Sequence, residues 1–390
     1  MKILLVHNFY QQPGGEDQVF RAEAGILRNA GHTVVELTET NDRVKEMSAL
    51  ALARATIWNS DAYQRVYETA TRERPAVVHF HNTFPLLSPA VYYAARRAGA
   101  AVVQTLHNYR FLCPAATLFR DGRPCEDCVG HLPWPGVLHA CYRGSRTASA
   151  GIAAMLGFHR LRQTFSRQVD AFIVLNEFAR QKFLRGGLPP EKLFLKPNFV
   201  DPDPSFGDGG ETFLFAGRLS PEKGIEILLA AWRESPDLPL LKIAGDGPLR
   251  AAVLDQIGSI KNAEYLGRIP HAEVLAAMKS SKALIQPSTW YEMFPVNVVE
   301  AFACGLPVIA SDAGALPEIV SNRTNGLLFQ SGNSKDLGRK VRLLASDSGL
   351  CCTLRKHARQ AFERYYQGDL NVRLLVQIYE NAIQSSNSRR

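Results

Sequence analysis

Short apolar runs alternate along this chain with longer amphipathic segments. Residues 2–7 (KILLVH) and 33–37 (TVVEL) are compact apolar runs, and residues 18–30 between them repeat apolar positions at helical spacing. Runs of this kind are typical of strands buried on both faces, and a helix between two such strands makes a parallel crossover connection. The opening therefore predicts a βαβ unit in a doubly wound α/β fold.

The same alternation continues to residue 197 and starts again near residue 212. In between, residues 197–211 (PNFVDPDPSFGDGGE) are dense in proline, glycine and aspartate, as linkers are. A chain of 390 residues also exceeds what one hydrophobic core usually supports. We therefore predict a first Rossmann-like domain over 1–197, a linker over 198–211, a second Rossmann-like domain over 212–366 and a C-terminal helix over 367–390 that crosses back to the first domain.

Composition and charge limit the classes of protein to which this chain can belong and the partners that it can bind. The chain is 46% hydrophobic and 21% charged, with a formal net charge of +8, so a soluble globular protein with anionic partners is expected. No dense Lys/Arg run or nucleic-acid motif occurs, which argues against nucleic acid as a partner. The first apolar run is too short for a signal peptide, and no run of 18 apolar residues occurs. We expect a cytoplasmic protein that at most touches the inner face of a membrane.

Glu292 and Glu300 lie in the segment 286–320 of the second half, with seven residues between them. Glu292 precedes Pro295, a residue suited to the first turn of a helix, so Glu292 is expected in a loop and Glu300 inside the following helix. Gly305 is expected to end that helix. The first N–H groups of a helix lack intrahelical partners and carry the positive end of its dipole, which favours phosphate binding. The segment therefore predicts an anion site flanked by two carboxylates, although two glutamates on a solvated helix are the plain alternative.

This segment resembles the E-x7-E signature of the family 4 retaining glycosyltransferases. The match comprises Glu292, Phe294, Glu300, Ala301, Ala303, Gly305, Pro307, Val308, Ile309 and Ala310. Pro295 stands where the family usually has glycine, which leaves the N–H groups of Val296 and Asn297 as the expected phosphate donors. The resemblance implies two Rossmann-like doubly wound domains facing a central cleft (GT-B), and a role in bacterial polysaccharide assembly.

A second match follows the first strand of the second half. Gly217, Arg218 and Lys223 stand in the segment GRLSPEKG, which is similar to the family's G-R-L-x-x-E-K-G. By this resemblance Arg218 and Lys223 grip the diphosphate of a nucleotide sugar, Glu300 binds the ribose and Glu292 the sugar. Arg268 and Ile269 stand where the family holds the base. The implied chemistry needs no cofactor, and the implied partners are a nucleotide diphosphate sugar and a saccharide or lipid-linked saccharide acceptor.

The first half offers weaker signals at the ends of its strands. Gly14 and Gly15 match a glycine pair that faces the cleft in this family, but a plain turn explains them equally well. His81 and His107 each end a predicted strand, where ligands of α/β sheets bind. In the family a histidine at the position of His107 bonds the donor sugar, whereas a structural histidine is the plain alternative.

Four cysteines mark an unusual loop. Cys113, Cys125, Cys128 and Cys141 have the spacing C-x11-C-x2-C-x12-C in a segment rich in proline and glycine. Such a set can supply four thiolates to one structural Zn²⁺. Unligated thiols or a redox-active pair are equally compatible with the spacing, and His131 or His139 can replace a cysteine. The remaining cysteines, 304, 351 and 352, are expected to pack within helices.

Residues 143–167 alternate basic and apolar side chains. They predict either a helix packed on the first domain with exposed arginines or a basic amphipathic helix on anionic lipid. Three alternatives to a hexosyltransferase follow from the sequence as a whole. They are a sugar-nucleotide epimerase of the same architecture, a non-catalytic scaffold that binds nucleotide sugars, and a basic adaptor at a membrane surface.

Overall fold

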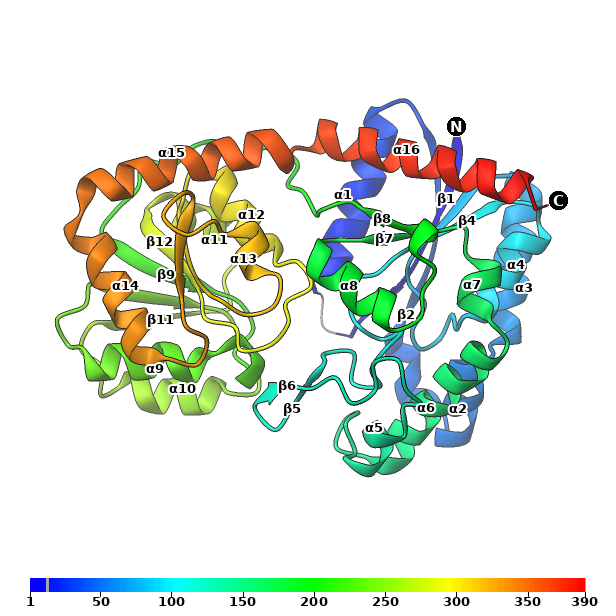
Figure 1. Cartoon of the computed structure of the whole chain (residues 1–390), viewed down its shortest axis with the longest axis horizontal. Helices are drawn as coiled ribbons and strands as arrows, with labels where there is room; N and C mark the ends of the chain where they lie inside the picture. Colours follow the sequence, from blue (N-terminus) through cyan, green and yellow to red (C-terminus); the bar gives the residue numbers. More distant parts are fainter. Residues whose placement is uncertain (12–13, 390) are drawn as a thin grey trace. The chain divides into compact units, whose positions relative to one another are not determined.

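The computed structural model of the chain describes residues 1–11 and 14–389. Gln12 and Pro13, which precede the glycine pair Gly14 and Gly15, lie outside the described residues, as does Arg390 in the predicted C-terminal helix. The chain divides into two compact units (Figure 1). Unit 1 comprises residues 1–118, 125–197 and 369–390, and unit 2 comprises residues 119–124 and 198–368.

Unit 1 is built on a six-stranded parallel sheet with the order β2-β1-β3-β4-β7-β8. Its strands are β1 (Lys2–Phe9), β2 (Thr33–Thr40), β3 (Val77–Asn82), β4 (Ala101–Thr105), β7 (Ala171–Val174) and β8 (Leu193–Leu195). Its helices are α1 (Gly15–Asn29), α2 (Ala49–Ile57), α3 (Ser60–Glu73), α4 (Ala90–Arg97), α5 (Trp134–Leu138), α6 (Arg146–Leu161), α7 (Thr164–Gln168), α8 (Glu177–Arg185) and α16 (Gly368–Asn387). The strand order reverses direction at β1 and β3, so right-handed crossovers place helices on both faces.

Periodicity explains the first βαβ unit. The β1 side chains from Ile3 to Val6 are fully buried, as expected of a central strand in a parallel sheet. On α1, Val19, Phe20 and Leu27 form the buried face. Each such side chain contributes about 1.5–3 kcal/mol when it leaves water, so this face holds the helix against the sheet.

Helix α16 belongs to unit 1 although it ends the chain (Figure 1). Tyr379 on α16 is fully buried, and its hydroxyl lies 2.8 Å from Nδ1 of His79 on β3. Asn371 donates to the carbonyl of Pro197 at 2.7 Å and accepts from the Lys196 ammonium at 2.9 Å. These polar contacts fix the helix at two points, in its first turn and about three turns from its start.

Unit 2 repeats the architecture with the strand order β11-β10-β9-β12-β13-β14. Its strands are β9 (Thr212–Ala216), β10 (Leu241–Ala244), β11 (Ala263–Gly267), β12 (Ser281–Gln286), β13 (Val308–Ser311) and β14 (Gly326–Phe329), all parallel. Its helices are α9 (Ile225–Glu234), α10 (Arg250–Ile257), α11 (His271–Lys279), α12 (Val296–Ala303), α13 (Leu316–Ile319), α14 (Ser334–Ser346) and α15 (Ser348–Tyr365). The order reverses between β9 and β12, which makes this pair the switch point of the sheet.

The predicted doubly wound α/β class is confirmed by the two parallel sheets, whereas several details differ. The segment 143–167 forms two helices, α6 and α7, because the chain turns through a left-handed conformation at Gln163 (φ 53°). Cys304 and Cys351 are buried as expected, but Cys352 is exposed on α15. Among the described residues, no helix has both the length and the apolar character needed to cross a membrane.

Candidate functional site

The switch point of unit 2 gathers the strongest sequence motifs. The segment 217–224 follows β9, and the segment 287–295 follows β12, so both lie beyond the carboxyl ends of neighbouring strands. Ligands of open α/β sheets bind at this place. A backbone contact confirms the proximity of the segments, since the N–H of Thr289 donates to the carbonyl of Glu222 at 2.9 Å.

Glycine makes this close approach possible. Gly224 adopts a left-handed conformation (φ 71°), and a Cβ at this position would lie 1.8 Å from the carbonyl oxygen of Pro287. A side chain at residue 224 would therefore push the two segments apart.

Lys223 and Glu292 form an ion pair across the two segments. Lys223 Nζ lies 2.6 Å from Glu292 Oε1, whose carboxylate also accepts from Ser288 Oγ at 2.6 Å and from Gln286 Nε2 at 3.0 Å. The Glu292 side chain is 4% exposed. Burial alone would raise the pKa of Glu292, but the Lys223 ammonium and the hydrogen bond from Ser288 hold the pKa below its usual value. Glu292 is therefore ionised and fixed in position.

Arg218 lies on the same loop with its side chain exposed. Within the described part of the chain, no carboxylate makes a salt bridge with it. Arg218 and Lys223 thus differ. The Arg218 guanidinium is available to an incoming anion, whereas the Lys223 ammonium is already paired with Glu292.

The segment 287–295 leads directly into α12, so the N-terminus of α12 lies at the same switch point. Pro295 is the N-cap, and the N–H groups of Val296 and Asn297 lie in the first turn, where no intrahelical acceptor exists. The Asn297 side chain donates to the carbonyl of Ala216 at 2.9 Å and to Gln286 Oε1 at 3.0 Å. These two bonds tie the start of α12 to the carboxyl ends of β9 and β12.

Glu300 has a partner that the sequence motifs do not reveal. His271, the first residue of α11, lies with Nε2 at 2.7 Å from Glu300 Oε1. The hydrogen bond and charge of Glu300 raise the pKa of His271 above its usual value, because they favour the protonated ring more than partial burial disfavours it. No short motif could have found this pair, since its members lie on two helices 29 positions apart.

The other predicted donor-binding residues have varied surroundings. Gly217 and Arg268 follow the carboxyl ends of β9 and β11, and Ile269 is half-buried beside Arg268. Phe294 is buried, with its ring centroid 5.9 Å from that of Tyr366. The Phe294 side chain therefore packs within unit 2, and its carbonyl accepts from Asn198 at 3.4 Å.

In unit 1 the ends of β1 and β3 carry a buried group of charged and aromatic residues. Glu23 on α1 accepts from Lys196 Nζ at 2.6 Å and lies 3.3 Å from His81 Nε2. His79 bonds Thr105 through Nε2 at 2.8 Å and Tyr379 through Nδ1. Burial would raise the pKa of Glu23, but Lys196 holds it well below the usual value. Burial lowers the pKa of His79 strongly, so that ring is neutral.

His107 extends this group. Its Nε2 lies 3.0 Å from Nδ1 of His81, so a bond from His107 to any ligand would come from Nδ1. Burial lowers the pKa of His107 well below its usual value, and the His81 ring lowers it further. A neutral histidine ring has one N–H donor and one acceptor nitrogen, so Nδ1 of His107 can bond a ligand without bringing a charge to the site.

The glycine pair of unit 1 is less open to a ligand than the sequence suggests. The Gly14 N–H donates to Asp17 Oδ2 at 2.8 Å, and Asp17 Oδ1 lies 2.6 Å from His7 Nε2. Gly15 begins α1 and retains a first-turn N–H. Glu16 accepts from Asn108 at 3.3 Å, and burial raises the pKa of Glu16 to about 8.

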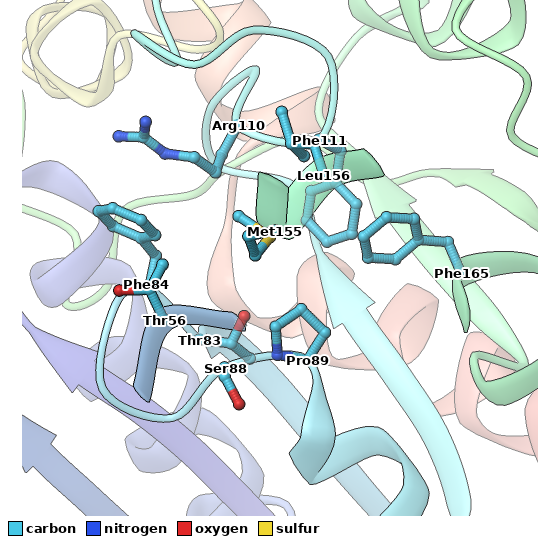
Figure 2. Close-up of a pocket in the computed structure, with 10 residues that line it drawn as sticks. All are labelled: Thr56, Thr83, Phe84, Ser88, Pro89, Arg110, Phe111, Met155, Leu156 and Phe165. Atoms are coloured by element: carbon cyan, nitrogen blue, oxygen red, sulfur yellow. The ribbon is translucent and has the colours of Figure 1, made fainter. Parts of the chain in front are cut away.

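A narrow cavity of about 20 Å³ lies in unit 1 (Figure 2). Its lining residues are Thr56, Thr83, Phe84, Ser88, Pro89, Arg110, Phe111, Met155, Leu156 and Phe165. Figure 2 shows Phe111 and Phe165 on one side, and Arg110 with the ring of Phe84 on the other. The volume suits about one water molecule, so this cavity is too small for a sugar.

Two groups of side chains are candidate metal sites. Glu23, His79 and His81 bring three donor atoms within 4.8 Å of one another. A divalent ion there would lie beside the Lys196 ammonium and compete with the bonds of His79, so the group is better described as a hydrogen-bonded charge network. The loop cysteines are not part of that group, and among the described residues no three of their sulfur atoms lie within 4.8 Å of one another.

The fold and the switch-point motifs define a glycosyltransferase of the GT-B class. A family model described as "Glycosyltransferase Family 4" matches residues 13–204, and one described as "Glycosyl transferases group 1" matches residues 200–361. The chain therefore belongs to family 4 of the glycosyltransferases, as its sequence motifs predict.

One relative is similar to this chain in sequence, and two solved structures are similar to it in fold. An uncharacterized glycosyltransferase of Methanocaldococcus jannaschii is 32% identical over 47% of this chain and 52% of its own length. The matched segment thus spans about half of that relative. Sucrose-phosphate synthase from Thermosynechococcus elongatus shares the fold with a TM-score of 0.73 at 17% identity, over 99% of this chain and 100% of that one. Anabaena HepE, solved in complex with UDP, gives a TM-score of 0.69 at 18% identity, over 97% of this chain and 100% of its own.

Proposed function

We propose that this protein transfers a hexose-type sugar from a nucleotide diphosphate donor to a hydroxyl group of a saccharide or lipid-linked saccharide, with retention of configuration. One observation carries the proposal. At the switch point of unit 2, Arg218, the Lys223–Glu292 pair and the first N–H groups of α12 converge on one sheet edge. That combination of cations and a helix N-terminus suits a diphosphate.

The proposed roles follow from charge and position. The diphosphate binds Arg218, Lys223 and the start of α12, and the ribose binds Glu300. Glu292 accepts hydrogen bonds from sugar hydroxyls, because its carboxylate is ionised and held by Ser288. By the family resemblance, His107 contributes a neutral hydrogen-bonding group to the donor sugar, and Arg268 with Ile269 contacts the base.

The chemical step breaks the bond between the sugar carbon and the phosphate oxygen, and its electron pair goes to the departing diphosphate. Negative charge therefore grows beside Arg218 and Lys223, which bind the transition state more tightly than the ground state. The acceptor oxygen forms the new bond from the face that the diphosphate leaves, and its proton passes to a departing phosphate oxygen. Arg218, Lys223 and a helix dipole supply the charge neutralisation, so the scheme assigns the reaction no cofactor.

Contact with an anionic membrane surface is proposed for unit 1. Four large apolar side chains around α5 and α6 are exposed, namely Leu132, Trp134, Leu138 and Leu161. α6 also carries the exposed Arg146 and is capped at its C-terminal end by the exposed Arg162, and basic residues beside exposed apolar ones favour anionic lipid. Flotation with vesicles containing anionic lipid should recover the protein, and replacement of Trp134 and Leu161 by serine should reduce that recovery. Equal recovery of both proteins would remove this contact from the proposal.

A donor panel tests the main proposal. Purified protein is incubated with UDP-, GDP- and ADP-sugars, alone and with a lipid-linked oligosaccharide, and nucleoside diphosphate release and product are measured. We expect release that one donor supports and that the acceptor accelerates. Conversion of the sugar without an acceptor would instead indicate an epimerase, and donor binding without turnover would indicate a scaffold.

A further inference from the structure

A row of buried polar side chains leads from α16 to His107 in unit 1. The Lys196 ammonium donates to Glu23 Oε1 at 2.6 Å and to Asn371 Oδ1 on α16 at 2.9 Å. Next in the row is His81, whose Nε2 lies 3.3 Å from Glu23 Oε2 and whose Nδ1 lies 3.0 Å from Nε2 of His107. The side chains of Lys196, Glu23 and His81 have no exposed surface. Their protons are therefore placed by neighbouring side chains and not by bulk water.

The charge of Glu23 decides which nitrogen of His81 carries the proton. Neither Glu23 Oε2 nor His81 Nε2 has another hydrogen-bond partner among the described residues. A proton on Nε2 lets the ring donate toward the carboxylate, whereas a bare Nε2 would direct its lone pair at a buried negative charge. The tautomer with its proton on Nε2 is therefore favoured, and Nδ1 of His81 is left as an acceptor.

The Lys196 ammonium already supplies the positive charge that Glu23 needs. Lys196 and Glu23 together carry no net charge, and both side chains are fully buried. A His81 ring with protons on both nitrogens would add a positive charge without a counter-ion, next to the His79 ring at a centroid distance of 4.4 Å. A buried charge without a partner costs more than a neutral hydrogen bond contributes. A single proton on His81 is therefore the favoured state.

His107 takes the complementary tautomer. Because Nδ1 of His81 is an acceptor, the 3.0 Å contact requires that Nε2 of His107 donate. The His107 ring is neutral, because burial lowers its pKa well below the usual value, so its Nδ1 carries no proton. In the described part of the chain, Nδ1 of His107 has no hydrogen-bond partner, and the side chain is only half-buried. This nitrogen is therefore ready to accept a hydrogen bond from a ligand.

We infer that Glu23 is a positioning residue that fixes Nδ1 of His107 as a hydrogen-bond acceptor. The inference rests on the proposed function for its substrate: the group that His107 recognises is a hydroxyl of the donor sugar, which donates its proton to Nδ1. A carbonyl, ether or fluorine at the same place would face the lone pair of Nδ1 without a hydrogen to share. Glu23 is fully buried, so it acts on specificity through His81 and touches no ligand itself.

Nitrogen NMR of the full-length protein, labelled with ¹⁵N in its histidine rings, tests the tautomer without any ligand. A ring nitrogen that carries a proton and one that does not give well-separated signals. The signals of His107 are those that disappear in His107→Gln. We expect a protonated Nε2 and an unprotonated Nδ1 for His107 in the wild type. A proton on Nδ1 would overturn the inference, whatever the activity of the protein.

The double variant Glu23→Leu with Lys196→Met tests the role of Glu23. Apolar side chains often replace a buried ion pair without loss of stability. We expect the Nδ1 signal of His107 to move toward that of a protonated nitrogen, because His81 no longer has a carboxylate that holds its proton on Nε2. If the double variant does not fold, Glu23→Gln keeps the size of the side chain, removes its charge and carries the same expectation.

Glu39→Gln is the matched control. Glu39 is another buried carboxylate of unit 1, paired with Arg43 and Arg65, and its printed ion pairs involve no histidine. Its replacement should leave both His107 signals where they are in the wild type. An unchanged His107 tautomer in the Glu23 variants, or an equal change in Glu39→Gln, would contradict the positioning role of Glu23.

Donor analogues test the substrate side, with Kd measured by titration calorimetry. The hydroxyl in contact with His107 is the one whose removal weakens binding to the wild type but not to His107→Ala. Fluorine at that position should not restore the binding, because it accepts and does not donate. Restored binding, or the absence of any such hydroxyl, would exclude the assigned contact. A donor panel without turnover would contradict the proposed function, whereas the NMR result would stand independently of it.

Discussion

At the scale of single residues, the Lys223–Glu292 pair is the interaction with the clearest energetic consequence. Lys223→Met leaves a nearly buried carboxylate without its counter-ion. We expect the free energy of unfolding to fall by about 2–3 kcal/mol, within the range for broken buried pairs that keep other hydrogen bonds. Urea unfolding measures the change.

Two further variants control this experiment. The double variant Lys223→Met with Glu292→Gln removes the uncompensated charge and should recover most of the lost stability. Lys335→Met, at an exposed position on α14, should stay within about 0.5 kcal/mol of wild type. A double variant as unstable as the single one would show that the charge of Glu292 does not explain the loss.

The His271–Glu300 pair predicts a pH dependence of donor binding. The folded-state pKa of His271 is raised above 6.5, so the charged pair is complete below pH 6.5 and is lost as the pH rises through the folded pKa. Neutral His271 releases Glu300 for the proposed contact with ribose. The donor KM of wild type should therefore fall relative to that of His271→Asn as the pH rises across this window. A KM ratio that does not change with pH would separate His271 from donor binding.

Sequence motifs identified the candidate site residues of unit 2 but not the side chains that form hydrogen bonds with them. The E-x7-E spacing identified Glu292 and Glu300, because that spacing lies within one loop and helix. The spacing carries no information about Lys223 or His271, which approach from other elements. Glu23, Lys196 and Asn371 are joined only by the tertiary fold, with more than 170 positions between the first two.

At the scale of elements, α16 stabilises unit 1 through polar contacts as well as packing. Tyr379→Phe removes the hydroxyl partner of the buried His79 Nδ1. We expect a loss of about 1–2 kcal/mol in unfolding free energy, because an unsatisfied buried polar group costs its desolvation. Tyr365→Phe, at a position 48% exposed, is the matched control and should be nearly neutral. Equal effects of the two changes would contradict this role of Tyr379.

The sequence predicted whether an element is a helix or a strand better than it predicted where that element begins and ends. The strands expected over residues 2–7 and 33–37 form, but they run on to Phe9 and Thr40, and the helix expected over 18–30 begins at Gly15 and ends at Asn29. The strand predicted to end at His107 ends at Thr105 instead, although the N–H of Leu106 still donates to the carbonyl of Ile173 on β7 at 2.9 Å. The break at Gln163 also escaped the pattern, since a left-handed residue other than glycine leaves no sequence signal.

At the scale of the whole molecule, the two units repeat one architecture but present different side chains where the strand order reverses. Both units are six-stranded parallel sheets with one reversal of strand order. Unit 2 presents Arg218 and Lys223 at its reversal, whereas unit 1 presents neutral histidines and buried acids. Periodicity predicted the two sheets, but only the folded structure shows which strands are neighbours and hence which loops share a switch point.

The most direct test of the proposed mechanism is the kinetics of Arg218→Ala, with Lys335→Ala as a matched surface control. Initial rates with the donor found in the panel give kcat, and titration calorimetry with the corresponding nucleoside diphosphate gives Kd. We predict a kcat lower by about 10²–10³-fold, as for the loss of one preorganised charge-stabilising group, with Kd changed less than kcat. A kcat equal to that of the Lys335→Ala control would contradict the claim that Arg218 stabilises the departing diphosphate.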